Sequence, residues 1–303
     1  MKLRNFLPII FTCLATVIST AQAENEKTYT IKLHQDAKKG DKIHADFKFQ
    51  QASSQKVLVG TDVVQEQVEE LNANGSGILE VLEVSPHHKI TKMKLKVEKF
   101  VVTNGDEGSA KLQADSEVIG TLGEGKKVTF TVDGEEPAPD VTKALTMIFE
   151  MSPDKEEEIT DDEVCLTNQP RAVGSSWDAD MKKALKSMPE DIPMEFDAAD
   201  AKGTVKFPAV KTEQGLECAL VQFDVEMKPK ALKGVPPQFK LGKSGMKMSL
   251  EKLVPLNGTT PALEEKQKMD FSFTGKVPTP DGTEAKLDIG GSISRSFIMK
   301  EIK

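Results

Sequence analysis

Aromatic residues are scarce in this 303-residue chain: they make up 5% of it, with one Trp and one Tyr. This scarcity disfavours a carbohydrate-binding surface, which needs several planar aromatic side chains. Beyond the N-terminus no stretch approaches the roughly 20 apolar residues of a transmembrane helix. The net charge is −8 and no cluster of basic residues is present, which disfavours nucleic acid and anionic membranes as partners.

Sequence motifs of catalysis are also missing. The chain has no Gly-x-Ser-x-Gly elbow, phosphate-binding loop or dinucleotide-binding glycine pattern. His87 and His88 fall in a predicted turn without the spacing of zinc ligands. Glu157 and Asp161 could act as an acid and a base, but they lie in an acidic run that reads as a linker. The sequence therefore predicts no catalytic, metal-binding or cofactor-binding residue, and no cofactor.

The N-terminus has the pattern of a secretory signal peptide over residues 1–23. Lys2 and Arg4 precede the mainly apolar Phe6–Ile18, and Ala21-Gln22-Ala23 is the small-x-small pattern of a cleavage site. A retained N-terminal anchor is the alternative. We expect an exported chain that begins near Glu24, with a net charge of about −10. The expected location is the periplasm or the outside of the cell.

Cysteine is rare, with three in the chain. Cys13 belongs to the predicted signal peptide, which leaves Cys165 and Cys218. Because export usually ends in an oxidising compartment, these two are candidates for one disulfide. The alternative is two separate free thiols.

The first half, residues 24–152, is predicted to be a β-rich domain. Ile43–Phe49 alternates apolar and polar residues, as a half-buried strand does. Asn72–Gly77 contains Asn-Gly and Gly-Ser-Gly, which predict a turn. Asp140 then precedes apolar residues at helical spacing, so a helix should close this domain.

The second half is predicted to follow an acidic linker, residues 153–169, and to form a second β-rich domain over residues 170–303. Its strands place Met246, Met248, Met269 and Phe271 on inner faces. Together with Trp177 these side chains could line a hydrophobic ligand site, although methionine more often only fills a core. For residues 177–188 the local signals favour a helix, with Ser175 or Ser176 as its cap.

A short internal sequence similarity favours a strand, rather than a helix, at the start of that segment. Gly40–Lys48 and Gly174–Lys182 both follow the pattern G-x-x-(large apolar)-x-A-D-(large apolar)-K. This similarity suggests that the two halves of the chain are a duplicated unit. The Val-Gly-x-x-Trp turn that ends at Trp177 resembles one that recurs in uncharacterised exported β-rich bacterial proteins. Ser175 replaces the usual Asp of that turn, and the resemblance implies only an exported β-rich scaffold.

The sequence thus predicts a mainly β (α+β) fold with two antiparallel curved-sheet domains and two or three helices. The leading functional interpretation is a non-catalytic exported protein of the periplasm or cell envelope, a binding or structural scaffold. One alternative is a carrier that holds a hydrophobic, lipid-like ligand between a curved sheet and a helix. Another is a hydrolase with dispersed site residues. The expected partner is an envelope protein or a hydrophobic small molecule.

Overall fold

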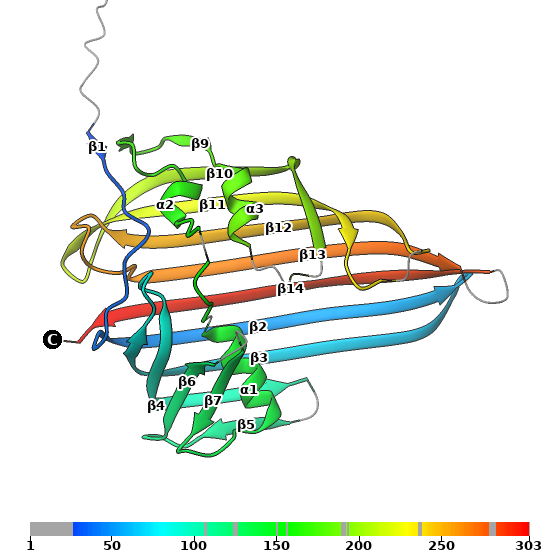
Figure 1. The fold of residues 1–303 in the computed structure, drawn as a ribbon, viewed down its shortest axis with the longest axis horizontal. Helices are drawn as coiled ribbons and strands as arrows, with labels where there is room; N and C mark the ends of the chain where they lie inside the picture. Colours follow the sequence, from blue (N-terminus) through cyan, green and yellow to red (C-terminus); the bar gives the residue numbers. More distant parts are fainter. Residues whose placement is uncertain are drawn as a thin grey trace, which may run out of the picture.

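The computed structural model describes residues 27–105, 108–123, 127–149, 151–155, 157–188, 192, 194–235, 238–278 and 283–302. The predicted signal peptide, residues 1–23, lies outside the described residues. The described chain forms one 12-stranded antiparallel sheet, a separate pair of short strands and three helices (Figure 1). The prediction of a mainly β fold is confirmed.

The strands are long, as the extended alternation of the sequence indicates. They are β1 (Thr28–Tyr29), β2 (Lys42–Val59), β3 (Asp62–Val84), β4 (Ile90–Asn104), β5 (Ser109–Leu112), β6 (Glu117–Leu122), β7 (Val128–Val132), β8 (Arg171–Ala172), β9 (Ser176–Asp178), β10 (Met194–Glu213), β11 (Leu216–Leu232), β12 (Lys240–Pro255), β13 (Glu264–Pro278) and β14 (Glu284–Glu301). The helices are α1 (Pro139–Ile148), α2 (Asp161–Val164) and α3 (Met181–Ser187).

The two halves of the sequence share a single sheet. Its strand order is β7-β6-β4-β3-β2-β14-β13-β12-β11-β10-β9, with β5 beside β4. The last strand, β14, returns to pair with β2 along its whole length, from Glu301 beside Ile43 to Ala285 beside Val59. The strands of the two predicted domains are therefore joined by continuous hydrogen bonding. β2, β3, β13 and β14 run on past the helices to a free end (Figure 1).

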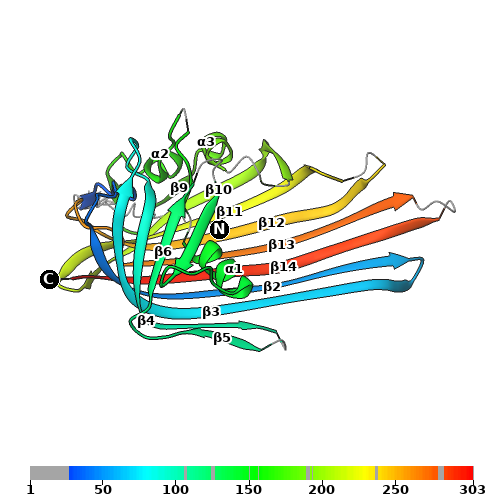
Figure 2. The ribbon, with the colours of Figure 1, turned by 60° about the horizontal axis from the view of Figure 1, so that its bottom comes forward.

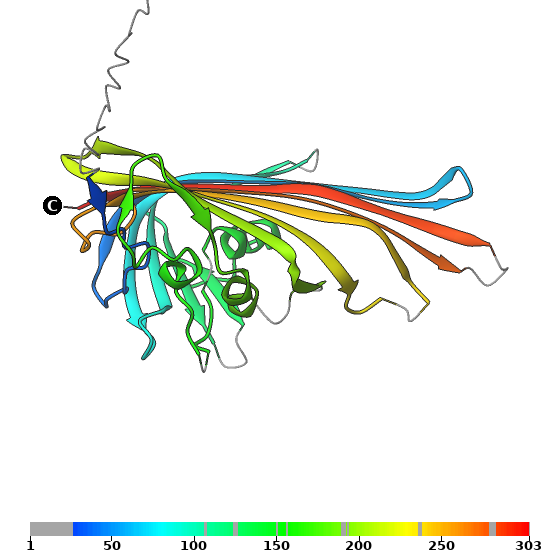
Figure 3. The same cartoon turned by 90° about the horizontal axis from the view of Figure 1, so that it is seen from above.

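All three helices lie on one side of the long strands, here called the front face (Figure 3). Two hydrophobic clusters fill the space beneath them. The first lies under α1, where β4, β6 and β7 cross the direction of the long strands (Figure 2), and includes Phe47, Phe49 and Leu145. The second lies under α2 and α3 and includes Phe207 and Val225. Because side chains alternate along a strand, the opposite back face is mainly polar.

The two cysteines lie on opposite faces of the sheet. Cys165 belongs to the cluster under α2 and α3, whereas Cys218 packs on the back face with Leu220, Leu253 and Leu263. Both are buried free thiols. The predicted Cys165–Cys218 disulfide is therefore not formed, because the thickness of the sheet separates the two side chains.

The turn predicted at Asn72–Gly77 is wrong, because this segment lies in the middle of β3. Its glycines serve a close approach between strands rather than a turn. A Cβ atom on Gly77 would lie 2.2 Å from the carbonyl oxygen of Lys96, and one on Gly75 would lie 2.5 Å from that of Lys99. Only glycine fits where β4 pairs with β3 so closely.

The segment with conflicting signals, residues 177–188, contains a strand and then a helix. Gly40 and Gly174 both have positive φ, 91° and 84°, and each precedes a strand. The similarity between the two segments thus extends into the first residues of β2 and β9. It ends at Asp180, whose carboxylate accepts hydrogen bonds from the backbone N–H groups of Lys182 and Lys183 and begins α3. The helix cap is Asp180, so the predicted cap at Ser175 or Ser176 is wrong.

Candidate ligand site

A cavity of about 400 Å³ lies between the front face and helices α2 and α3. This volume falls within the roughly 300–1,000 Å³ typical of small-molecule sites. Its lining combines apolar side chains of the helices and sheet with a few polar ones: Leu33, Asp161, Val164, Cys165, Ala184, Ser187, Met188, Val221, Phe223, Met248, Leu250, Lys252, Glu265, Gln267 and Arg295. A mainly apolar lining with convergent polar groups is the usual composition of a binding site.

Four of these side chains form what we call the charged row: Asp161, Lys252, Glu265 and Arg295. The Lys252 ammonium donates to the Asp161 carboxylate at 2.7 Å and lies 3.3 Å from that of Glu265. An Nη atom of Arg295 lies 3.7 Å from the same Glu265 carboxylate. Lys252 and Glu265 are direct neighbours across β12 and β13, so the strand register fixes this contact.

The sheet members of the charged row are mostly buried, whereas the helix member is half exposed. Lys252 and Arg295 are each 14% exposed and Glu265 is 20% exposed, whereas Asp161 is 49% exposed. The row therefore runs from the floor of the cavity up to its rim at α2. Two cations and one anion come from the sheet, and the second anion comes from the helix.

Electrostatics favour the ionised forms of Lys252 and Asp161. Burial lowers the pKa of Lys252, but the nearby carboxylates of Asp161 and Glu265 outweigh burial and raise it above its ordinary value of 10.5. Partial desolvation of its half-exposed side chain raises the pKa of Asp161, but the attraction of Lys252 outweighs this effect and holds the pKa below its ordinary 3.8. Burial also raises the pKa of the Cys165 thiol to about 12, which keeps it protonated and poorly nucleophilic.

The front face changes from charged to apolar along each strand beyond the row. On β13 the residues of this face are Glu265, Gln267, Met269, Phe271 and Phe273 in order. The same order holds on the two neighbouring strands. β12 runs from Lys252 through Leu250 and Met248 to Met246, and β14 from Arg295 through Ile293 to Ile289. The charged end lies under α2, and the apolar end continues toward the free end of the strands.

We call five half-buried side chains at that apolar end the platform: Met248, Met269, Phe271, Ile289 and Ile293. They come from three adjacent strands and lie in neighbouring register rows. Phe271 and Phe273 stack with ring centroids 5.6 Å apart. Met248 belongs to the cavity lining as well, so the cavity and the platform are continuous.

The segment that roofs the cavity is held by specific contacts. Thr160 and Glu163 form a reciprocal capping box at the start of α2. Asp162 accepts hydrogen bonds from the backbone N–H groups of Leu33 and His34 at 2.7 and 3.1 Å. The acidic segment predicted as a linker, residues 153–169, thus contains a short helix that is bonded to the N-terminal segment and to the sheet. Glu157 and Asp161 are each engaged with a lysine, Lys186 and Lys252 respectively.

Trp177 lies outside the cavity, on the edge strand β9, which pairs with β10. Its indole N–H donates to the carbonyl oxygen of Cys165 at 2.6 Å, and the Arg171 guanidinium lies 4.3 Å from its ring centroid. Its partly buried ring packs against the cluster under α2 and α3. Trp177 therefore positions the end of α2 and does not line the cavity.

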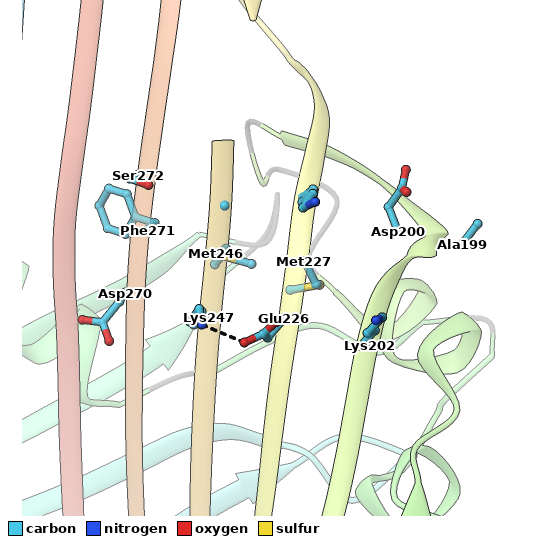
Figure 4. A pocket seen from close by; sticks show the side chains of 12 residues that line it. Ala199, Asp200, Lys202, Glu226, Met227, Met246, Lys247, Asp270, Phe271 and Ser272 are labelled. Carbon is cyan, nitrogen blue, oxygen red and sulfur yellow. Dashed lines mark hydrogen bonds and ion pairs between the residues drawn. The ribbon is translucent and has the colours of Figure 1, made fainter. Parts of the chain in front are cut away.

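The other four residues predicted to line a ligand site lie together on the front face. Met248, Met269 and Phe271 belong to the platform, while Met246 is buried beside them at 4% exposure. Met246 and Phe271 also border a hollow of about 520 Å³ at the bend of β10 and β11 (Figure 4).

The other side chains of that hollow are mainly exposed surface groups. Its ion pair, Lys247 with Glu226 at 2.7 Å, belongs to the back face and is at least 64% exposed. Such a pair is held weakly in water. The cavity with the buried charged row is therefore the better candidate site.

A smaller cavity of about 250 Å³ lies on the other side of the row, toward α1. Glu265 and Arg295 line this cavity as well as the first one. Its remaining lining is apolar: Leu79, Ile90, Met93, Ile148, Phe149, Met151 and Phe297. The charged row thus divides the front face between the two hydrophobic clusters.

The sequence analysis missed Lys252, Glu265, Gln267 and Arg295. A signal for the first three was present, because each continues the inner-face alternation of the methionine and phenylalanine positions: Lys252 lies two residues beyond Leu250, and Gln267 two before Met269. Their partner Asp161 is 91 residues from Lys252 in sequence, and only the fold brings the two together.

No family model and no curated protein matches the chain. Among solved structures it is similar to one titled "Lipid-protein interactions in lipovitellin", with a TM-score of 0.33 and 7% identity over 88% of this chain. The match spans 26% of that structure's chain. Within the described residues, no helix has the length and apolarity needed to cross a membrane, and no group of three or more His, Cys, Asp or Glu side chains is placed to hold a metal ion.

Proposed function

We propose that this protein is an exported, non-catalytic binding protein that holds a lipid-like ligand on the front face of its sheet. The observation that carries the proposal is the continuity between the 400 Å³ cavity and the half-buried platform. The ligand's apolar part lies along Met248, Met269 and Ile293, and α2 with α3 covers the cavity end. An export signal over residues 1–23 is part of this proposal.

The chemistry of the platform suits such a ligand. Methionine and isoleucine side chains give adaptable apolar contacts without directional hydrogen bonds, so they accept flexible chains of varied shape. Each methylene that moves from water to such a surface contributes roughly 0.8 kcal/mol. A chain of about ten methylenes therefore has several kcal/mol available to offset the cost of association.

Binding of a fluorescent fatty acid such as cis-parinaric acid to the full chain tests the proposal. We expect saturable binding with increased fluorescence. Met269→Gln should weaken it about tenfold, because an amide placed against an apolar chain loses water without a partner, at roughly 1–3 kcal/mol. Native mass spectrometry of the purified protein should show a bound lipid-sized molecule.

The matched control is Ser292→Gln, which puts the same amide on the back face next to Asp270. This control should bind the probe as the original chain does. The proposal is refuted if the chain shows no saturable binding, or if the Met269 and Ser292 variants lose binding equally.

A further inference from the structure

We infer that the ligand carries an anionic head group, a carboxylate or a phosphate, which takes the place of the Asp161 carboxylate beside Lys252. This inference rests on the proposed function and specifies the ligand class. Asp161 then acts as an internal stand-in for the ligand's anion while the site is empty.

The pairing of Lys252 supports an anionic ligand. On the sheet, Glu265 lies within 4 Å of both Lys252 and Arg295. Asp161 of α2 supplies the second carboxylate beside Lys252. A ligand that displaces Asp161 replaces this partner of the mostly buried Lys252 ammonium only if it brings a negative charge, and loss of a partner by a buried charge is costly.

Asp161 is the member of the row that can leave at low cost. Its side chain is 49% exposed, so its carboxylate returns to water when the contact with Lys252 breaks. The neighbouring acids have other roles in the fold. Asp162 binds the backbone of Leu33 and the Thr167 hydroxyl, and Glu163 completes the capping box. Loss of the Asp161 contact leaves these bonds in place.

The dimensions agree with a single extended chain. From Gln267, beside Arg295, to Phe273 is six residues along β13, or about 20 Å at the rise of an antiparallel strand. An amphiphile with its head group at the charged row therefore lies with its chain along the platform. A cationic head group would meet Lys252 and Arg295 at close range, and such like-charge contact costs several kcal/mol.

Two probes that share one acyl chain test the inference: cis-parinaric acid, which is anionic, and its methyl ester, which is uncharged and one methyl group larger. The original chain should bind the acid more tightly than the ester by about tenfold. Asp161→Asn should bind the acid severalfold more tightly, because the competing internal anion is gone, and should leave the ester unchanged. Lys252→Gln should abolish the preference for the acid, so that this variant binds the acid and the ester with about equal affinity.

Lys266→Gln is the matched control, because Lys266 is next to Glu265 in β13 but belongs to the back face, where it pairs with Glu264. It should keep the full preference for the acid. Ester binding by each variant shows whether that variant is folded. Equal affinity for acid and ester, or an Asp161→Asn variant with weaker acid binding, overturns the head-group inference and leaves the proposed function standing. Failure of both probes to bind overturns the proposed function itself.

Discussion

Replacement of Lys252 by methionine is the most direct test of the charged row as a structural element. Methionine has a similar length and no charge, so the change removes the cation and keeps most of the volume. Glu265 is left 20% exposed, with Arg295 as a partner at 3.7 Å. Asp161 loses its 2.7 Å contact, but its carboxylate is half exposed and can be hydrated.

The size of the effect follows from this burial. Removal of one partner of a fully buried pair costs about 3–5 kcal/mol, chiefly because the other charge is left uncompensated. Here Glu265 keeps a second cation and Asp161 reaches water. We therefore expect Lys252→Met to lower the free energy of unfolding by about 2 kcal/mol. Asp161→Asn should cost less than about 1 kcal/mol, as expected for a contact with a half-exposed group.

Urea unfolding provides the measurement, with tryptophan fluorescence and far-UV circular dichroism as signals. The single tryptophan, Trp177, donates to the Cys165 carbonyl at the end of α2, so its fluorescence reports on the segment that carries Asp161. The two signals should give the same midpoint. The reasoning is refuted if Lys252→Met stays within about 0.5 kcal/mol of the original chain, or if Asp161→Asn is the more destabilising change.

Three further predictions concern pH, glycine and the two clusters. The folded-state pKa of Asp161 is lowered from its ordinary value of 3.8. The ionised carboxylate therefore contributes stability above pH 3.8, and this contribution is lost as the pH falls through the lowered folded-state pKa. In urea titrations, the stability difference between the original chain and Asp161→Asn should shrink from about pH 6 to about pH 3. Gly77→Ala should cost about 2 kcal/mol or more because of the Lys96 carbonyl, while Gly245→Ala, with open space around its Cβ, should cost under about 1 kcal/mol in the same assay. Phe49→Ala and Phe207→Ala, in different clusters of one sheet, should each cost about 3–5 kcal/mol and shift one common thermal transition; two separate transitions would contradict a single cooperative unit.

The sequence predicted the strands well where alternation was regular. Ile43–Phe49 and Met269–Phe273 lie in strands with the apolar side chains on the front face, because a period of two leaves one consistent assignment of faces. The helix near Asp140 was also predictable, since Pro139 begins α1 and its buried residues follow at helical spacing. Local patterns of this kind depend on neighbouring residues and need no knowledge of the fold.

Other features depend on contacts between distant residues. Gly75 and Gly77 have the sequence of a turn, but the approach of β4 requires them in a strand. The Cys165–Cys218 disulfide was a reasonable expectation from an even count, but the thickness of a sheet separates the two side chains. The pairing of β14 with β2 joins the first and last strands of the sheet along the chain, and no local pattern indicates which edges meet.

The charged row itself argues for a role beyond stability. Replacement of a buried ion-pair network by well-packed apolar side chains is often neutral or stabilising, so stability gives little reason to keep Lys252, Glu265 and Arg295 on a face shared with methionine and phenylalanine. The row lies at the end of that face which α2 covers, and its one exposed member comes from α2. An amphiphile needs a polar end and an apolar path in this relation. The proposed exchange of the Asp161 carboxylate for a ligand's head group would account both for the burial of the sheet charges and for the exposure of Asp161.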